Sequence, residues 1–240
     1  MRRFAEQMGW ASDRGGFAIE AAVDERLGFL RKTYGLLTLQ ILAVGGLSAL
    51  LIQNEPLLIS LYNLVWGHGI LLTLALLIGF SFVTRRMLAT HKPLGVQYAA
   101  AALWVALFTT IVAPSTYAAK ELTGSYAIVL QAFILTVCVF GGLTAYVLTT
   151  KKDFSPIGGF LSVALVSMVA IAIMGSFMGF GGIWMSFVFV AIFAGYVLYD
   201  TSQILHRRGT DEYVSASVDL LTDFVFLFLH ILSILMSNRD

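Results

Sequence analysis

Apolar residues along this chain are gathered into long runs, and the polar residues lie between the runs. Each run is about 20 residues long, which is the length that an α-helix needs to cross the hydrocarbon core of a bilayer. Such runs exclude an outer-membrane barrel, whose strands are short and alternate in hydropathy. Seven runs predict seven membrane-spanning helices: Thr33–Ile52, Leu64–Val83, Leu94–Ala113, Tyr126–Leu148, Ile157–Phe177, Ile183–Ile204 and Ser217–Met236.

Only the Gly-rich stretch Gly179–Gly182 separates the fifth run from the sixth. It is either a tight turn between two helices or an interruption within one, so six spans is the alternative count. The seven-span interpretation predicts an all-α, polytopic membrane protein. It has a cytoplasmic tail over residues 1–32, a seven-helix transmembrane bundle over 33–236 and a short external tail over 237–240.

The composition agrees with a membrane protein. Hydrophobic residues make up 58% of the chain and charged residues 12%, against about 45–50% and about 25% in ordinary globular domains. These proportions exclude a disordered chain and a typical soluble enzyme. The net charge of +1 gives no field that would attract polyanions. We therefore expect membrane lipid as a partner and no nucleic acid.

Lys and Arg are distributed unequally between the two sets of connecting segments. The set that includes the N-terminal tail carries thirteen, whereas the opposite set carries only Lys120 and Arg239. Because cytoplasmic loops are enriched in Lys and Arg, this asymmetry predicts a cytoplasmic N-terminus. The alternation of rich and poor loops also favours seven spans over six. The thirteen are Arg2, Arg3, Arg14, Arg26, Arg31, Lys32, Arg85, Arg86, Lys92, Lys151, Lys152, Arg207 and Arg208.

Three acidic residues fall inside predicted spans: Asp200, Asp219 and Asp223. A charge in the bilayer core costs about 2.5–3.5 kcal/mol on insertion scales, so buried carboxylates are candidates for function. Asp219 is near the start of the last helix, and we expect its side chain to reach the lipid headgroups. Asp200 and Asp223 are each about 9 Å deep at the helical rise of 1.5 Å per residue. The short loop between their helices predicts antiparallel neighbours, with both carboxylates in one interface.

A polar stripe follows the last predicted helix. Asp219, Asp223 and His230 lie within about 40° of one another at 100° per residue, although the rest of the helix is apolar. A helix facing lipid would not carry this stripe, so we expect the C-terminal helix to be central and to line a cavity. His230 alone would be more typical of a core histidine, but because it is aligned with two carboxylates we expect it, with Asp219, to form part of a polar ion path.

Two basic residues, Arg85 and Arg86, end the second predicted helix on the cytoplasmic side. They either mark the cytoplasmic boundary of the membrane, or one of them folds inward as a reversible latch on Asp200 or Asp223. Two close carboxylates titrate as a coupled pair, and a latching Arg would make their titration a switch between two forms.

Enzyme motifs are poorly matched. An intramembrane aspartyl protease would carry G-x-G-D where Leu220–Asp223 stands, and the four histidines show no HxxxH spacing for a zinc hydrolase. We therefore expect no enzyme and no cofactor. Calcium prefers about six to eight oxygen ligands, so Asp200 and Asp223 would form only a weak calcium site, compatible with passage of the ion.

Three segments carry a family resemblance. Thr144–Asp153 contains a TT(K/R)(K/R)D pattern, Tyr199–Ile204 a (Y/F)(D/E)TxxI pattern, and Asp223–Leu229 resembles a seventh-helix motif. From about residue 30 to the C-terminus the chain resembles the Bax inhibitor-1 family of seven-helix membrane proteins. It departs from the family motif at Thr222, usually Leu, and at Phe226, usually Asn.

The nearer likeness is to the bacterial YccA-like branch, through Ala145–Thr150, Thr201-Ser202 and Leu232–Leu235. That branch tends to lose the aspartates that this chain keeps. The resemblance places the protein in a bacterial cytoplasmic (inner) membrane.

The resemblance implies a pH-sensitive calcium leak in which two aspartates on the last two helices act as the sensor. Asp200 and Asp223 match this pair, and Arg85 or Arg86 matches the latch. The alternative is a modulator of an FtsH-type membrane protease without a transport role, for which the 32-residue tail would be the handle.

Overall fold

The computed structural model describes residues 23–66, 70–178 and 182–237. The first 22 residues of the expected cytoplasmic tail and most of the expected external tail lie outside these ranges. Within them the chain is all-helical and has no strand. The helices are α2 (Val23–Ile52), α3 (Glu55–Trp66), α4 (Ile70–Met87), α5 (Leu94–Thr123), α6 (Ala127–Thr150), α7 (Gly158–Met178), α8 (Ile183–His206) and α9 (Tyr213–Ser237), with a 3₁₀ turn, η1, at Ser155–Ile157.

Six helices in the described part are long and apolar enough to cross a membrane: α2, α5, α6, α7, α8 and α9. The fifth and sixth apolar runs form separate helices, α7 and α8, each of at least 21 residues. The second run is divided between α3 and the 18-residue α4, which is not among the six. The all-α membrane fold is therefore confirmed, and the seven-span count stays a prediction.

Helix α2 begins at Val23, within the segment that was expected to be tail. Helix α5 continues past the predicted end at Ala113, through Pro114, to Thr123. Helix α2 therefore begins earlier than its apolar run predicts, and helix α5 ends later than its run predicts. Helix α5 then ends at Gly124, whose positive φ of 71° suits a residue without a side chain and whose N–H bonds to the Lys120 carbonyl.

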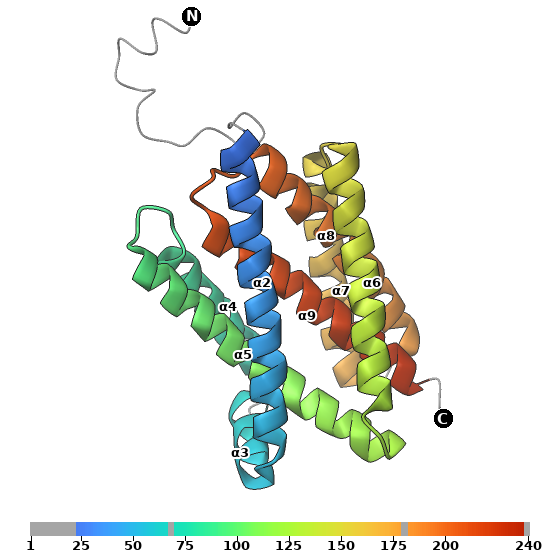
Figure 1. The fold of residues 1–240 in the computed structure, drawn as a ribbon. Coiled ribbons are helices and arrows are strands. Elements are labelled where there is room, and N and C mark those ends of the chain that lie inside the picture. The colour runs from blue at the N-terminus through green and yellow to red at the C-terminus, as the bar shows by residue number, and fades with distance from the viewer. Residues whose placement is uncertain (1–22, 67–69, 179–181, 238–240) are drawn as a thin grey trace, which may run out of the picture.

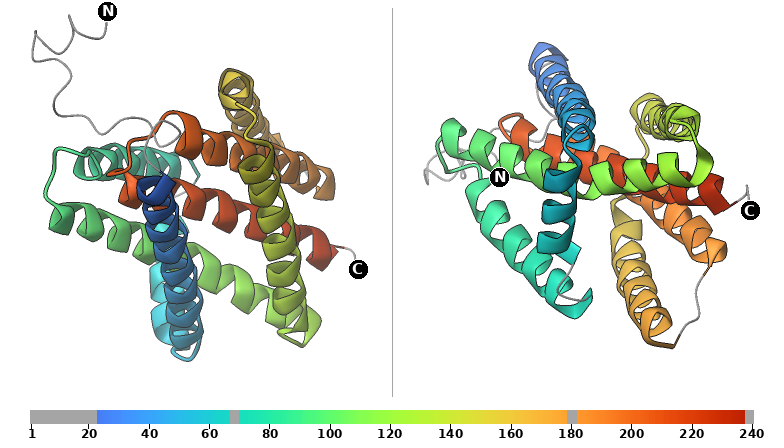
Figure 2. Two further views of the ribbon diagram at one scale, coloured as in Figure 1. Left: turned by 45° about the horizontal axis from the view of Figure 1, so that its top comes forward. Right: turned by 90° about the horizontal axis from the view of Figure 1, so that it is seen from below.

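The C-terminal helix α9 is the centre of the bundle. It packs against α2, α5, α6 and α8, and Figures 1 and 2 show it crossing behind α2 and α6. Buried side chains occur all around it, including the fully enclosed Leu220, Leu227 and Leu232. The polar stripe of α9 would be costly against lipid, and it is shielded because neighbouring helices surround α9.

Helices α7 and α8 approach closely because glycines face side chains of the other helix. A Cβ atom at Gly158 would lie 2.3 Å from the Tyr199 ring, and one at Gly195 would lie 2.6 Å from Leu161. Small residues at such contacts allow helices to pack in a membrane, where burial of apolar surface gives no driving force between them.

The basic connecting segments meet at one end of the bundle. Lys32 of α2 lies over the Tyr213 ring at the start of α9, Thr90 donates to Glu212, and His206 contacts the Lys151 carbonyl. The described segments that carry most of the Lys and Arg residues are therefore gathered at one end of the bundle, as an orientation determined by positive charge would require.

This arrangement predicts the topology. A phosphatase fused after Asp240 is expected to be active, because α9 ends at Ser237, at the end of the bundle opposite the basic segments. The same enzyme inserted after Lys152 is expected to be inactive, since that loop would face the cytoplasm. Enzyme activity in intact cells is the measurement, and an inactive C-terminal fusion would contradict the proposed orientation.

Candidate functional site: a carboxyl cluster between α4, α8 and α9

The two aspartates that were expected to pair do lie together. Asp200 is near the C-terminal end of α8, and Asp223 is in the third turn of α9, only 3% exposed. Their carboxyl groups lie within hydrogen-bonding reach of each other. The Oδ2 atom of Asp223 has no hydrogen-bond partner in the protein. A buried polar atom without a partner is rare and costly, which favours a proton shared between the two groups or a bound polar ligand.

Both carboxyl groups line a cavity of about 300 Å³ between α4, α5, α7, α8 and α9. Its walls are mixed, because aromatic side chains from α5, α8 and α9 alternate with polar groups. The residues that line it are Leu77, Ser81, Arg85, Leu88, Trp104, Leu107, Phe108, Ile111, Leu165, Phe193, Tyr196, Asp200, Val218, Asp219, Thr222, Asp223 and Phe226.

Asp219 lines the same cavity and is held by two arginines. Arg208 donates from Nη2 to Asp219 and from Nη1 to Ser215 Oγ at 2.8 Å. The Arg85 Nη2 atom lies 3.8 Å from Asp219 Oδ1. That Asp219 reaches the level of the lipid headgroups stays a prediction. Helix α9 begins at Tyr213 instead of Ser217, which places Asp219 in its second turn with a side chain only 17% exposed.

The two latch candidates behave differently. Arg85 lines the cavity, but its ion pair is with Asp219. The expected contact was with Asp200 or Asp223. Arg86 lies over the Phe82 ring, with its guanidinium carbon 4.2 Å from the ring centre. Successive residues of a helix point about 100° apart, so only one of the two can face the cavity, and that residue is Arg85.

His230 lies apart from the carboxyl cluster. Its ring stacks on Phe189 at 4.5 Å between ring centres and on Phe193 at 5.9 Å. The helical phase places it on the same stripe as Asp223, but seven residues of α9 separate the two by about 10 Å along the axis. Phenylalanines of α8 fill that interval, so His230 does not line the cavity.

Sequence reasoning missed Arg208, which it counted only as a boundary charge. A signal was available: Ser215 and Asp219 are four residues apart and share a face of α9, directly after the loop that carries Arg208.

The charges of the cluster nearly balance. When Asp219, Asp200 and Asp223 are all ionised, the positive charges of Arg85 and Arg208 leave the cluster with a net charge of −1. One proton on the pair makes it neutral, and a neutral cluster is the least costly to bury.

Within the described ranges, no group of three or more His, Cys, Asp or Glu side chains is arranged to hold a metal ion. Asp219 is already engaged by Arg208, so only Asp200 and Asp223 remain to offer carboxylate oxygens. A weak calcium site at this pair stays a prediction.

The TTKKD loop and the Tyr199–Ile204 segment pack against each other. Asp153 Oδ1 accepts a hydrogen bond from the Ser155 N–H at 2.8 Å and one from Ser202 Oγ at 3.3 Å. The hydrogen bonds from Ser155 hold the pKa of Asp153 below its usual value. The loop is therefore tied to the end of α8 that carries Asp200, so two of the sequence motifs form one structural unit.

Comparisons with known proteins identify a family and several relatives of this chain. The family described as "Inhibitor of apoptosis-promoting Bax1" matches residues 26–240. The chain is 30% identical to the Golgi anti-apoptotic protein of Vaccinia virus (strain Lister), over 94% of this chain and 92% of the viral protein. It is 33% identical to Protein lifeguard 4 of Mus musculus, over 92% and 90%. It is 30% identical to Bax inhibitor 1 of Schizosaccharomyces pombe, over 92% and 81%.

These relatives come from a virus, an animal and a yeast, so the bacterial YccA-like branch and the bacterial inner membrane stay predictions. The family match runs through the loop that holds Asp153, the end of α8 and the whole of α9. The chain therefore belongs to the Bax inhibitor-1 family, described as inhibitors of apoptosis-promoting Bax1.

Proposed function

We propose that this protein is a pH-sensitive cation leak through its membrane, with calcium as the permeating ion and the Asp200–Asp223 pair as the pH sensor. The observation that carries the proposal is that the buried Asp223 and the partly buried Asp200 meet at the wall of one cavity, whose lining is otherwise mainly apolar. Ionisable groups inside a membrane protein are costly and are typical of ion or proton pathways.

Charge supplies the coupling between pH and conformation. The negative charge of the pair adds to that of Asp219 in attracting Arg85, which reaches the cavity from α4. A proton that binds the pair removes part of this attraction, and Arg85 then returns more readily to the membrane surface, where 69% of its side chain is already exposed. Lower pH therefore favours the form in which the cavity is open on the Arg85 side.

The size of the site suits passage of a cation more than storage. Two carboxyl groups supply fewer oxygens than calcium prefers, so a bound ion would leave quickly. The cavity of about 300 Å³ exceeds the share of about 30 Å³ that a water molecule occupies in the liquid, so it has room for a partly hydrated ion.

Calcium flux into liposomes tests the proposal. Purified protein in liposomes loaded with a calcium indicator is expected to admit calcium faster as external pH falls from about 8 to about 5, a range in which an ordinary Asp, with a pKa of about 3.9, would stay ionised. Protein-free liposomes give the background. Flux no faster than this background at every pH would refute the leak.

The neighbouring arginines provide a matched test of the latch. Arg85→Ala is expected to raise flux at high pH toward its low-pH value, because the charge that closes the cavity is gone. Arg86→Ala removes the same charge one residue away, where the side chain lies over Phe82, and is expected to behave like the wild type. Equal responses of the two variants would exclude Arg85 as the latch.

A further inference from the structure

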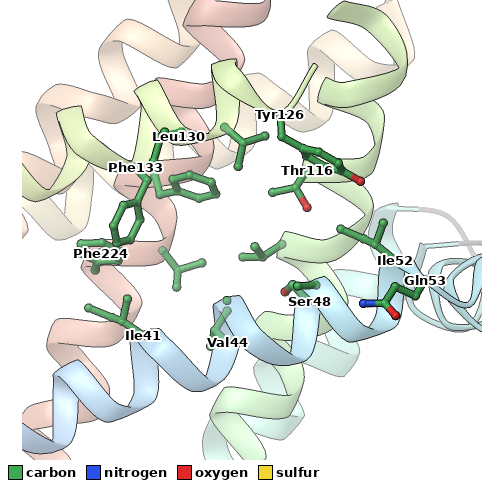
Figure 3. Close-up of a pocket in the computed structure, with 16 residues that line it drawn as sticks. Ile41, Val44, Ser48, Ile52, Gln53, Thr116, Tyr126, Leu130, Phe133 and Phe224 are labelled. Carbon is green, nitrogen blue, oxygen red and sulfur yellow. The ribbon is translucent and has the colours of Figure 1, made fainter. Parts of the chain in front are cut away.

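A second hollow lies on the opposite half of the bundle from the carboxyl cluster. It has a volume of about 560 Å³ and is bounded by α2, α5, α6 and α9. Figure 3 shows α2 and α6 as its two sides, with side chains from both pointing into the space between them. Phe224 of α9 lies at its inner wall, next in sequence to Asp223.

The length of this groove corresponds to one leaflet. Its lining on α2 runs from Ile41 to Gln53. The twelve residues from Ile41 to Ile52 are separated by eleven helical steps, which span about 16 Å at the rise of 1.5 Å per residue. Half of the hydrocarbon core of a bilayer is about 15 Å thick. The groove thus extends from one membrane boundary to about the middle.

The groove is polar at the boundary end and apolar at the inner end. Gln53, Thr116 and Tyr126 lie at the boundary end, whereas Ile41, Val44, Leu130, Phe133 and Phe224 line the inner part. The cationic Lys120 lies 5.9 Å from the Tyr126 ring, and it also forms an exposed ion pair with Glu121. Tyr and Lys side chains are typical of the headgroup level of a membrane.

One polar atom inside the groove lacks a partner. Ser48 lines the groove, is 3% exposed, and its Oγ atom makes no hydrogen bond within the protein. Buried hydroxyl groups are nearly always paired. Ser48 lies five residues below Gln53, about 7.5 Å along α2, which is the level at which a lipid ester carbonyl would follow a headgroup at the boundary.

We infer that the groove holds one acyl chain of a glycerophospholipid from the leaflet opposite the basic face of the protein. The inner wall contacts the chain, Ser48 donates to its ester carbonyl, and Lys120 with Tyr126 lies at the level of the phosphate. The inference does not depend on the proposed leak.

Two adjacent glycines of α2 allow a matched test. Gly45 lines the groove, Gly46 does not, and a Cβ atom at either would meet nothing within 4 Å. Gly45→Leu therefore fills the groove without a backbone clash, while Gly46→Leu adds the same side chain elsewhere on α2. Ser48→Ala removes the hydroxyl group and leaves the volume nearly unchanged.

The probe is a phosphatidylcholine that carries a photoreactive diazirine on one acyl chain, mixed at low proportion into phosphatidylcholine liposomes that contain the full-length protein. Mass spectrometry maps the cross-links. Labelling of groove residues on α2 and α6 is compared with labelling of the lipid-exposed face of α7, at Phe160, Val163 and Val166, as the measure of general lipid contact.

The wild type and Gly46→Leu are expected to show groove labelling well above that of the α7 face, and Gly45→Leu to lose the excess. Ser48→Ala is expected to lower the groove labelling about fivefold at limiting probe, the effect of one lost hydrogen bond. Groove labelling equal to that of α7 in the wild type would overturn the inference, as would equal loss in Gly45→Leu and Gly46→Leu. If Gly45→Leu does not fold, the Ser48→Ala result decides: unchanged labelling would overturn the inference.

Discussion

Asp200→Asn and Asp223→Asn are each expected to abolish most of the pH dependence of calcium flux, and the double variant is expected to add little. The two carboxyl groups lie within reach of each other at one cavity wall, so they share their protons and act as one titrating unit. Removing either member leaves a single carboxyl group without its coupled partner. Effects of residues that act as a unit are not additive.

Flux in liposomes at a series of pH values is the measurement, and Asp211→Asn is the control. Asp211 is an exposed aspartate in the loop between α8 and α9, so the same substitution there changes net charge without touching the cavity. Full pH dependence in both Asp200→Asn and Asp223→Asn would rule out the pair as the sensor, even if the protein still conducts calcium.

Arg208→Ala is expected to lower the free energy of unfolding by about 2–3 kcal/mol. This is somewhat less than the loss of about 3–5 kcal/mol when one partner of a fully buried ion pair is removed, because both side chains are slightly exposed. The substitution leaves Asp219 with the more distant Arg85 alone, and it removes the donor to Ser215 Oγ. The loss arises chiefly from the carboxylate that stays behind, whose charge is then poorly compensated in a largely buried position.

The adjacent residue is the control for this stability prediction. Arg207 also forms an ion pair, 3.9 Å from Asp153, but 58% of its side chain is exposed. Exposed pairs contribute less than about 1 kcal/mol, so Arg207→Ala should be nearly neutral in reversible unfolding from detergent micelles. Combining Asp219→Asn with Arg208→Ala should recover part of the stability, because the uncompensated charge is removed. Equal destabilisation by Arg207→Ala and Arg208→Ala would contradict the role assigned to Arg208.

The sequence by itself determined most of the helices and the pairing of the two acidic residues. A helix satisfies its own backbone hydrogen bonds, which is what a chain in a bilayer requires, so every apolar run except the second could be translated into a single helix without knowledge of its neighbours. Asp200 and Asp223 were predictable as partners because a short loop forces their helices to lie antiparallel, although α9 begins four residues earlier than predicted and places Asp223 further along its helix from the loop than Asp200.

The tertiary structure alone decided which side chains meet. Periodicity gives the face and depth of a residue but not the group that occupies the opposite side of the interface. It therefore could not distinguish Arg85 from Arg86, foresee that phenylalanines of α8 stack on His230, or assign Arg208 to Asp219.

The groove that Ser48 lines is another feature that only the tertiary structure decided. Its walls come from α2, α5, α6 and α9, which range from the start to the end of the described chain, and the space between them depends on how all four helices pack. A hollow is set by the packing of several elements at once, and no single run of residues encodes it.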